Sequence, residues 1–381
     1  LDAYALIYRA YYAFIKNPRI NSKGFNTSAI LGFVNTLEEV LKKENPTHIG
    51  VAFDPAGPTF RHEAFEQYKA QREETPEAIR LSVPIIKEII RAYRIPILEV
   101  AGYEADDVIG TLATEAGRQG IITYMMTPDK DYGQLVSDKV FMYRPKHTGG
   151  FEVMGVDEVK AKFDIQSPAQ VIDMLGLMGD SSDNIPGCPG VGEKTAQKLI
   201  AEFGSIENLL EHTDQLKGAL KTKVETNREM ITFSKFLATI KIDVPIQLDM
   251  DSLVREQADE DSLRQIFEEL EFRTLIDRVL KKENAGNGIT TPTGNKTAAE
   301  KSNLAPLPLF PEEGGAVQGD LFANFTGNEP GEAKNSNLAT LETLNCDYQL
   351  IDTEEKRTKI IQKLLTSKIL SLDTETTGTE P

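Results

Sequence analysis

The stretch Gly102-Tyr-Glu-Ala-Asp-Asp-Val-Ile-Gly-Thr-Leu-Ala113 places three carboxylates directly before an apolar run that is typical of a helix. Carboxylates this close together repel one another and raise each other's pKa values unless a cation neutralises them. On helical spacing Glu104 and Asp107 share a face, whereas Asp106 points away from Glu104. If Glu104 and Asp106 both bind metal, the helix must therefore begin after Glu104. Taken alone, the cluster could also be an acidic first turn that complements the helix dipole.

The region around this stretch alternates between short apolar strands and helical periodicity. Strands are expected at residues 47–53, 95–100, 121–126 and 140–143, and helices around 84–93 and 106–116. This alternation predicts an α/β fold with a mostly parallel sheet flanked by helices. Because ligands of such sheets bind beyond the carboxyl ends of the strands, we expect Asp54, Asp129 and Asp131 to converge there. Asp2 would join them if a first strand precedes it.

Residues 168–278 have helical periodicity, and Asp180 and Asp183 within them are spaced one helical turn apart. The turn Gly187-Cys-Pro-Gly-Val-Gly192 then leads into a helix expected at 193–203. This pattern predicts a helix-hairpin-helix element, in which backbone amides at a helix start bind nucleic-acid phosphates without reading sequence. Its candidate DNA contacts are Gly187, Gly190, Gly192, Lys194, Thr195 and Lys198.

The segment from Phe60 to Arg80 is helical in pattern but strongly charged. Aromatic residues stand at positions 60, 65 and 68, and basic residues at 61, 69 and 72. One interpretation is a solvated helix whose aromatic side chains contact the core. The other is an exposed helical arch that stacks bases and holds phosphates.

The composition limits the kind of metal site that this chain can build. Cys188 and Cys346 lie far apart, and the four histidines are scattered, so neither a disulfide framework nor a zinc site is expected. Any metal should be a hard cation held by oxygen, namely Mg²⁺ or Mn²⁺. The cysteine usage fits a reducing cytoplasm, and no apolar run approaches transmembrane length. The net charge of −17 counts against a nucleic-acid binder unless the carboxylates gather in a metal site.

Taken together, these motifs resemble the 5′ nuclease domains of bacterial DNA polymerase I, a family within the flap endonuclease superfamily. The matching motifs run in family order over about residues 1–280 and are Asp2 with Tyr8-Arg9-Ala-Tyr11, Phe53-Asp54, Glu104-Ala-Asp-Asp107, Asp129-Lys-Asp131, Gly179-Asp-Ser-Ser-Asp183-Asn184 and Gly190-Val-Gly-Glu-Lys-Thr195. The family often has Gly at the positions of Ala3 and Pro128. Neither difference replaces a carboxylate. Asp373-Thr-Glu375 resembles the opening motif of the 3′–5′ proofreading domain that follows in that polymerase.

The resemblance implies a domain layout. A PIN/5′-nuclease-like α/β core would span residues 1–167, with a helical arch near 60–80, and a helical helix-hairpin-helix subdomain would span 168–282. A disordered linker, indicated by its polar composition, would cover 283–343. The truncated start of a 3′–5′ exonuclease domain would cover 344–381, with a helix near 354–365 and a strand at 368–372. We interpret the chain as a fragment cut at both ends.

The resemblance also implies roles for the site residues. Two divalent ions would be bound, one by Asp54, Glu104, Asp106 and Asp129 and the other by Asp131, Asp180 and Asp183. Asp107 would support them and is also counted among the metal ligands, and Asp2, Asp106 and Asp107 are counted in the catalytic group. Arg9, Lys69 and Arg72 would hold the scissile phosphate. Arg61 and Tyr68 would contact DNA, the tyrosine by stacking on the terminal base. A K⁺ ion is a further expectation at the hairpin.

The implied activity is hydrolysis of DNA at 5′ ends and flaps during replication and repair, by a monomer in the bacterial cytoplasm, associated with the nucleoid and not with a membrane. In the linker, Gln318, Leu321 and Phe322 resemble the short peptides that dock replication enzymes onto the sliding clamp. Two alternatives stay open. One is a nuclease of the same architecture that acts on RNA, and the other is a DNA-junction binding module without catalysis.

Overall fold

The computed structural model describes residues 1–146, 150–280 and 353–365. The chain divides into two compact units, Leu1–Ala316 and Val317–Pro381. In the second unit the described residues form helix α15 (Glu354–Leu365), which confirms the helix expected there. The expected strand at 368–372, the Asp373 and Glu375 motif, and the linker residues Gln318, Leu321 and Phe322 lie outside the described residues.

A mostly parallel sheet forms the middle of the first unit, as predicted. Strand β1 (Val51–Ala52) pairs in parallel with β2 (Ile97–Leu98), and β3 (Thr123–Met126) pairs in parallel with β4 (Val140–Pro145). Strand β5 (Phe151–Met154) adds an antiparallel edge to β4 that the sequence analysis did not predict.

The first two residues join these two parts of the sheet. The amide of Ala52 donates to the carbonyl of Leu1 at 2.8 Å, and the amide of Asp2 donates to the carbonyl of Met126 at 3.1 Å. Leu1 and Asp2 thus lie between β1 and β3, with a parallel bridge from Asp2 to Ala52. Asp2 is therefore central in the sheet, beside the ends of the strands that carry Asp54 and Asp129.

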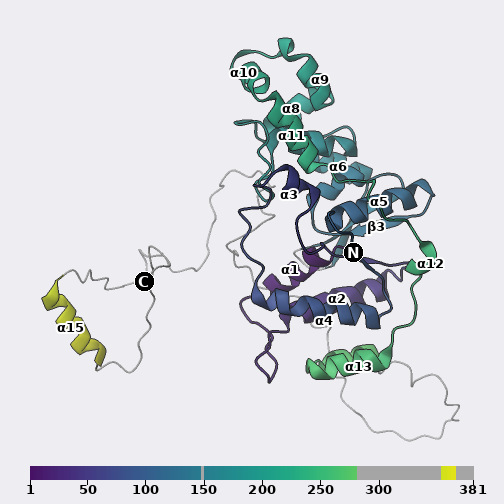
Figure 1. The fold of residues 1–381 in the computed structure, drawn as a ribbon, viewed down its shortest axis with the longest axis vertical. Coiled ribbons are helices and arrows are strands. Elements are labelled where there is room, and N and C mark those ends of the chain that lie inside the picture. Colours follow the sequence, from purple (N-terminus) through teal and green to yellow (C-terminus); the bar gives the residue numbers. More distant parts are fainter. Residues whose placement is uncertain (147–149, 281–352, 366–381) are drawn as a thin grey trace, which may run out of the picture. The chain divides into compact units, whose positions relative to one another are not determined.

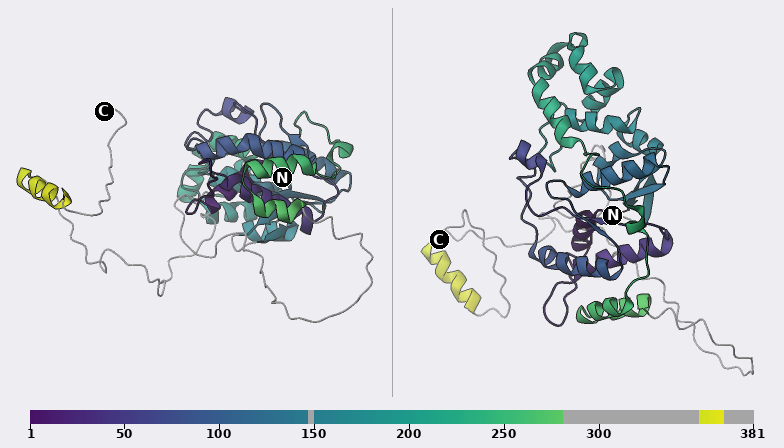
Figure 2. Two further views of the ribbon diagram at one scale, coloured as in Figure 1. Left: turned by 90° about the horizontal axis from the view of Figure 1, so that it is seen from below. Right: turned by 45° about the vertical axis from the view of Figure 1, so that its right-hand side comes forward.

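Helices cover both faces of this sheet (Figures 1 and 2). Helices α1 (Ala3–Ala13), α2 (Ser28–Lys43) and α4 (Glu77–Ala92) lie on one face, and α5 (Ala105–Arg118) lies on the other. The main core forms on the first face, where α13 (Glu260–Glu269) and α14 (Arg273–Leu280) also pack. Fully buried Phe33, Ile86 and Phe267 belong to it, and burial of side chains of this size contributes about 1.5–3 kcal/mol each.

The chain beyond β5 is helical up to Leu280 in the described residues, which confirms the prediction for 168–278. The elements are α6 (Val156–Phe163), η2 (Pro168–Gln170), α7 (Val171–Met178), α8 (Glu193–Phe203), α9 (Ile206–Glu211), η3 (Thr213–Gln215), α10 (Gly218–Thr226), α11 (Arg228–Ala238) and α12 (Met250–Leu253), followed by α13 and α14. Helices α8, α9 and α10 gather at one end of the unit (Figure 1). None of the helices in the described ranges has the length and apolarity needed to cross a membrane.

The segment 60–80 differs from its helical prediction. Only α3 (Phe60–Ala64) is helical, and turns follow until α4 begins at Glu77. Lys69 adopts φ 56°, and its amide donates to the carbonyl of Asp183 at 3.0 Å instead of to a helical partner. Bonds to a distant loop therefore replace the helix.

The spacing of Asp180 and Asp183 does not reflect a helix either. Helix α7 ends at Met178, and Gly179 follows at φ 75°, where a Cβ would come within 2.5 Å of the carbonyl of Ile185. The amides of Asp180 and Ile185 then pair with each other's carbonyls around a tight turn. The two aspartates consequently face different partners.

Candidate metal centre and nucleic-acid interface

The N-terminus of α5 organises the acidic site. Glu104 is the N-cap in extended conformation, and the helix begins at Ala105, so the expected helix start after Glu104 is confirmed. The amide of Glu104 donates to Asp107 Oδ2 at 3.1 Å, and the amide of Ala105 donates to Asp54 Oδ1 at 2.8 Å. The backbone donors at the start of this helix thus bring carboxylates from two elements together.

Arg61 lies behind this helix start with its side chain buried. Its Nη1 donates to Glu104 and Asp107, and its Nη2 donates to the other oxygen of Asp107, each at 2.8 Å. Its remaining donors reach the carbonyls of Leu237 and Thr239. Arg61 is 2% exposed, so the DNA contact expected of it is not supported, and the side chain instead neutralises buried carboxylates.

Asp107 is fully buried and takes a supporting place. Besides Arg61, its oxygens accept the amides of Glu104 at 3.1 Å and Lys241 at 2.8 Å. These donors occupy both carboxylate oxygens. The arrangement therefore does not favour the metal-ligand and catalytic roles expected of Asp107.

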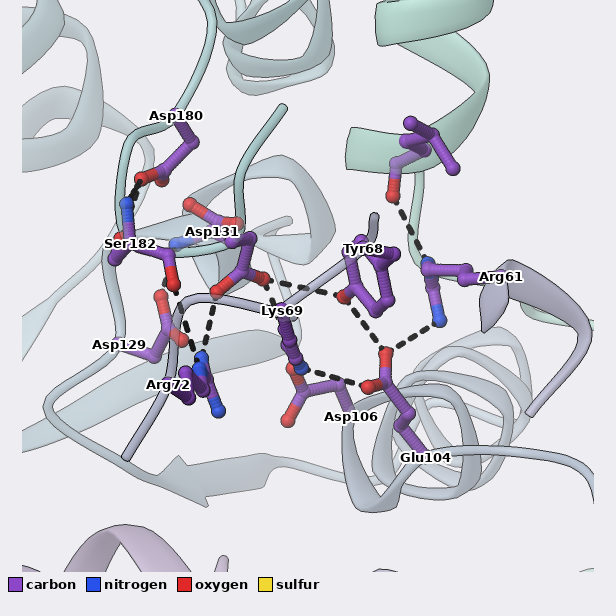
Figure 3. A network of polar contacts seen from close by, with 12 residues as sticks. Arg61, Tyr68, Lys69, Arg72, Glu104, Asp106, Asp129, Asp131, Asp180 and Ser182 are labelled. Atoms are coloured by element: carbon purple, nitrogen blue, oxygen red, sulfur yellow. Dashed lines mark hydrogen bonds and ion pairs between the residues drawn. The ribbon is translucent and has the colours of Figure 1, made fainter. Parts of the chain in front are cut away.

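The segment after α3 reaches into the acidic site with two cations (Figure 3). Lys69 Nζ lies 2.6 Å from Glu104 Oε1, and Arg72 Nη2 lies 2.6 Å from Asp183 Oδ1. The hydroxyl of Tyr68 lies 3.0 Å from Glu104 and 3.1 Å from Asp183. Tyr68 is 3% exposed, so the base stacking expected of it does not fit this arrangement.

These cations determine the charge state of the carboxylates that they contact. Burial alone would raise the pKa of Glu104, but Lys69 and Arg61 overcome it and hold that pKa below its ordinary value. Burial likewise opposes ionisation of Asp183, and Lys69 and Arg72 again lower its pKa. Both side chains are thus held as carboxylates by the protein itself.

A second group of carboxylates has no such cation. In residues 1–146 and 150–280 no lysine or arginine forms an ion pair with the members of this group, which are Asp2, Asp54, Asp106, Asp129 and Asp131. Burial, followed by repulsion from Asp54, raises the pKa of Asp2 to about 7. Burial, Asp2 and Asp129 raise the pKa of Asp106 well above its usual range. Burial and Asp129 do the same to Asp131.

Neutral donors hold part of this second group, and the sequence analysis missed them. Tyr132 donates its hydroxyl to Asp106 Oδ1 at 2.8 Å, and Thr127 donates to Asp2 Oδ2 at 3.0 Å. Tyr132 directly follows Asp131, and Thr127 lies two residues before Asp129, so proximity to the acidic motif was the available signal. Lys130, within the same motif, pairs with Asp180 at 2.8 Å.

The donor set fits a divalent cation that prefers oxygen. Asp131 Oδ1 is buried and has no hydrogen-bond partner, which costs free energy unless a ligand fills the position. As the side chains stand, no three of the described acidic, histidine or cysteine residues are placed to hold one ion. Glu104 and Asp183 are engaged by Lys69 and Arg72, so an ion held by either carboxylate would replace these contacts.

The side chain of Arg9, on α1, contacts the backbone that follows β4. Its Nη2 donates to the carbonyl of Lys146 at 2.7 Å, beyond the end of β4. Its expected contact with the scissile phosphate stays a prediction.

The glycine-rich turn before α8 divides into a buried and an exposed part. Gly187 is buried, and a Cβ there would lie 2.3 Å from the amide nitrogen of Gly179, so this glycine serves packing rather than the expected DNA contact. The exposed part comprises Gly190, Gly192, Lys194 and Lys198, with Thr195 half-buried between the lysines. Helix α8 has no side-chain N-cap hydrogen bond, so its first amides remain available to an anion.

Lys223, from α10, reaches this turn and was missed by the sequence analysis. Its Nζ donates to the carbonyl of Gly190 at 3.2 Å. Nothing near Lys223 in the sequence signals this contact. A cation of the chain thus already engages the turn, and the K⁺ ion expected there stays a prediction.

Comparisons with known proteins agree with this geometry. The family described as 5′-3′ exonuclease, N-terminal resolvase-like domain matches residues 1–164, and the family described as 5′-3′ exonuclease, C-terminal SAM fold matches residues 166–261. DNA polymerase I of Bacillus caldotenax is 41% identical, and that of Bacillus subtilis 43% identical, each over 282 residues or 73% of this chain. The chain spans 32% of the length of these relatives.

The fold is also similar to a solved structure of bacteriophage T5 flap endonuclease with DNA and metal ions. The TM-score is 0.52 at 22% sequence identity, covering 71% of this chain and 97% of that one. The two family matches together cover more than half of the chain and confirm the resemblance drawn from its motifs. The chain therefore belongs to the 5′–3′ exonuclease family.

Proposed function

We propose that this chain hydrolyses phosphodiester bonds at 5′ ends and 5′ flaps of DNA, as the 5′–3′ exonuclease part of a bacterial DNA polymerase I. The observation that carries the proposal is the group of carboxylates without ion-pair partners beside the ends of the parallel strands, two of which, Asp2 and Asp131, are buried. Buried carboxylates kept apart from lysine and arginine destabilise the protein unless a cation joins them. The family matches and the polymerase relatives support the same reaction.

Two divalent ions, Mg²⁺ or Mn²⁺, are the cations that we propose for this group. Asp54, Glu104, Asp106 and Asp129 would hold one, and Asp131, Asp180 and Asp183 the other. Such ions would supply Lewis-acid activation of water and of the scissile phosphate. Tyr132 orients Asp106 through its 2.8 Å hydrogen bond, and Thr127 orients Asp2 in the same way at 3.0 Å.

Lys69 and Arg72 would hold the scissile phosphate. Both already point into the acidic site, where each would exchange a carboxylate partner for a phosphate. Arg72 presents a planar donor pair that suits a phosphate, while Lys69 offers a compact charge.

The exposed part of the turn before α8 would bind duplex backbone away from the cut. Its uncapped amides and the exposed Lys194 and Lys198 suit phosphates but carry no means to read bases. Recognition should therefore depend on DNA structure rather than sequence, and binding should weaken steeply with salt.

Cleavage of a 5′-labelled flapped duplex in Mg²⁺ tests the proposal. Asp106→Asn should reduce the rate by about 100-fold or more, since it removes a charge from the ion site. Asp138→Asn, which changes an exposed aspartate, is the matched control and should cleave at the wild-type rate. Cleavage by Asp106→Asn at the wild-type rate would refute the assignment of Asp106 to the ion site.

The same assay separates the two alternatives. Faster cleavage of an RNA-only substrate than of the DNA flap would favour the RNA-directed nuclease. Tight flap binding without any Mg²⁺-dependent cleavage would favour the junction-binding module.

We also propose the domain layout of residues 1–167, 168–282, 283–343 and 344–381, a monomeric state and a cytoplasmic, nucleoid-associated location. We further propose that the chain binds a sliding clamp through Gln318, Leu321 and Phe322. Clamp binding that survives substitution of both Leu321 and Phe322 by alanine would remove that partner.

A further inference from the structure

Residues 67–72 form a strap that is tied to the loop 181–184. The side chain of Gln71 donates to the carbonyl of Ser181 at 2.7 Å, and that of Asn184 donates to the carbonyl of Gln67 at 2.7 Å. The amide of Lys69 donates to the carbonyl of Asp183 at 3.0 Å. These bonds join neutral groups, so they hold the strap in place independently of the charges that it carries.

The far end of the strap region is tied to a different element. The hydroxyl of Tyr8, on α1, donates to Thr75 at 3.1 Å. Thr75 lies just before α4, so the strap spans the acidic site between two anchored ends. Its path over the site can be followed in Figure 3, where Lys69 and Arg72 project between Glu104 on one side and Asp129 on the other.

The closed strap places two positive charges where divalent ions would bind. Lys69 Nζ contacts Glu104 at 2.6 Å and lies 3.7 Å from Asp183, while Arg72 contacts Asp183 at 2.6 Å. Each contact occupies a carboxylate oxygen and lowers the local negative potential. A divalent ion entering the site must displace these contacts and meets repulsion from the same side chains.

We propose that Gln71 and Asn184 are positioning residues that hold the strap closed over the acidic site. The closed strap weakens the binding of divalent ions until a nucleic-acid phosphate draws Lys69 and Arg72 away. The inference rests on the proposed metal-dependent nuclease function. It adds that ions and DNA bind cooperatively, because each ligand favours the strap position that the other needs. The chain thus limits ion occupancy when DNA is absent.

Neutral substitutions can loosen the strap without changing the charge of the site. Gln71→Ala removes the contact with Ser181, and Gln71 is exposed, so folding should be unaffected. Asn184→Gly removes the contact with Gln67 and tolerates the backbone φ of 57° at that position. Gln119→Ala is the matched control, since it removes an exposed glutamine hydrogen bond, to Glu115, on the surface of α5.

The first measurement is Ca²⁺ affinity of the DNA-free protein by titration calorimetry, because Ca²⁺ reports ion binding without turnover. Each strap variant should bind Ca²⁺ about 3- to 10-fold more tightly than wild type, as expected for one lost hydrogen bond, and Gln119→Ala should match wild type. The second measurement is the rate of trypsin cleavage after Lys69 and Arg72. It should rise in both variants, and saturating Ca²⁺ should raise it in the wild type.

The outcomes distinguish this inference from the proposed function. Absence of any Ca²⁺ or Mg²⁺ binding to the wild type and to both strap variants would overturn both. Equal Ca²⁺ affinity in wild type, Gln71→Ala and Asn184→Gly would overturn the strap inference alone. Slower trypsin cleavage of the wild type upon Ca²⁺ addition would also overturn it, because ions would then close the strap instead of opening it.

Discussion

Replacing Arg61 by alanine should strongly destabilise the protein. Its guanidinium is 2% exposed and neutralises Asp107, which is 0% exposed, and Glu104, which is 5% exposed. Removing one partner of a buried ion pair leaves an uncompensated charge and costs about 3–5 kcal/mol. Glu104 keeps Lys69 as a partner, so Asp107 accounts for most of the loss, and we expect about 3–4 kcal/mol for Arg61→Ala.

Urea unfolding followed by circular dichroism measures this loss. The chain contains no tryptophan, so intrinsic fluorescence offers a weak signal. Arg72→Ala is the control, because its side chain is 43% exposed and its removal should cost less than about 1 kcal/mol. Adding Asp107→Asn to Arg61→Ala removes the uncompensated buried charge of Asp107 and should recover part of the lost stability.

The two variants should also differ in their effect on DNA cleavage. Arg72→Ala should impair cleavage while leaving unfolding almost unchanged, whereas the main effect of Arg61→Ala should be on unfolding. A loss below about 1 kcal/mol for Arg61→Ala would refute the reasoning from burial. Weakened DNA binding at unchanged stability would restore the DNA contact first expected of Arg61.

Two further predictions concern stability. Burial raises the pKa of Asp2 to about 7 from its ordinary 3.8, so the folded, metal-free protein keeps a proton that the unfolded chain releases, and stability should fall as pH rises between these values. Melting temperatures in EDTA should show this decline, Asp131→Asn should flatten it, and a rise in stability over the same range would contradict it. Gly187→Ala should destabilise by about 3 kcal/mol or more, because a Cβ there would lie 2.3 Å from the backbone of Gly179 and the φ is positive. Gly24→Ala, also at positive φ but with nothing within 4 Å, should cost only about 1 kcal/mol in the same unfolding assay.

Elements set by local pattern were predictable from the sequence. The start of α5 after Glu104, the helix from Glu193 to Phe203 and the helix from Glu354 to Leu365 all follow from apolar periodicity and the residues at their ends. Strand positions followed in the same way, although β1 and β2 are shorter than the apolar runs suggested. Periodicity reports which face of an element is buried, and that information is local.

The strap and the loop after α7 were not predictable, because their conformations depend on each other. The carbonyl of Asp183 accepts the amide of Lys69, and Asn184 bonds to Gln67, across more than a hundred residues of sequence. Charged residues at helical spacing, such as Lys69 and Arg72, then gave a misleading helical pattern. The burial of Arg61 and Tyr68 against Glu104 was not predictable either, since side-chain type alone does not reveal a buried partner.

Asp106 and Asp107 show what decides the role of a carboxylate in this site. They are adjacent in sequence; Asp107 is fully buried and Asp106 is half-buried. Arg61 and two backbone amides surround Asp107, so its charge is already compensated and its oxygens are occupied. Asp106 receives only the hydroxyl of Tyr132 among the donors in the described chain, and burial with its acidic neighbours raises its pKa. A half-buried carboxylate without a cation partner destabilises the free protein when it ionises, and a bound cation removes that cost. For this adjacent pair, the cation partner therefore distinguishes the carboxylate that the protein neutralises from the one left for a bound ion, and sequence position does not.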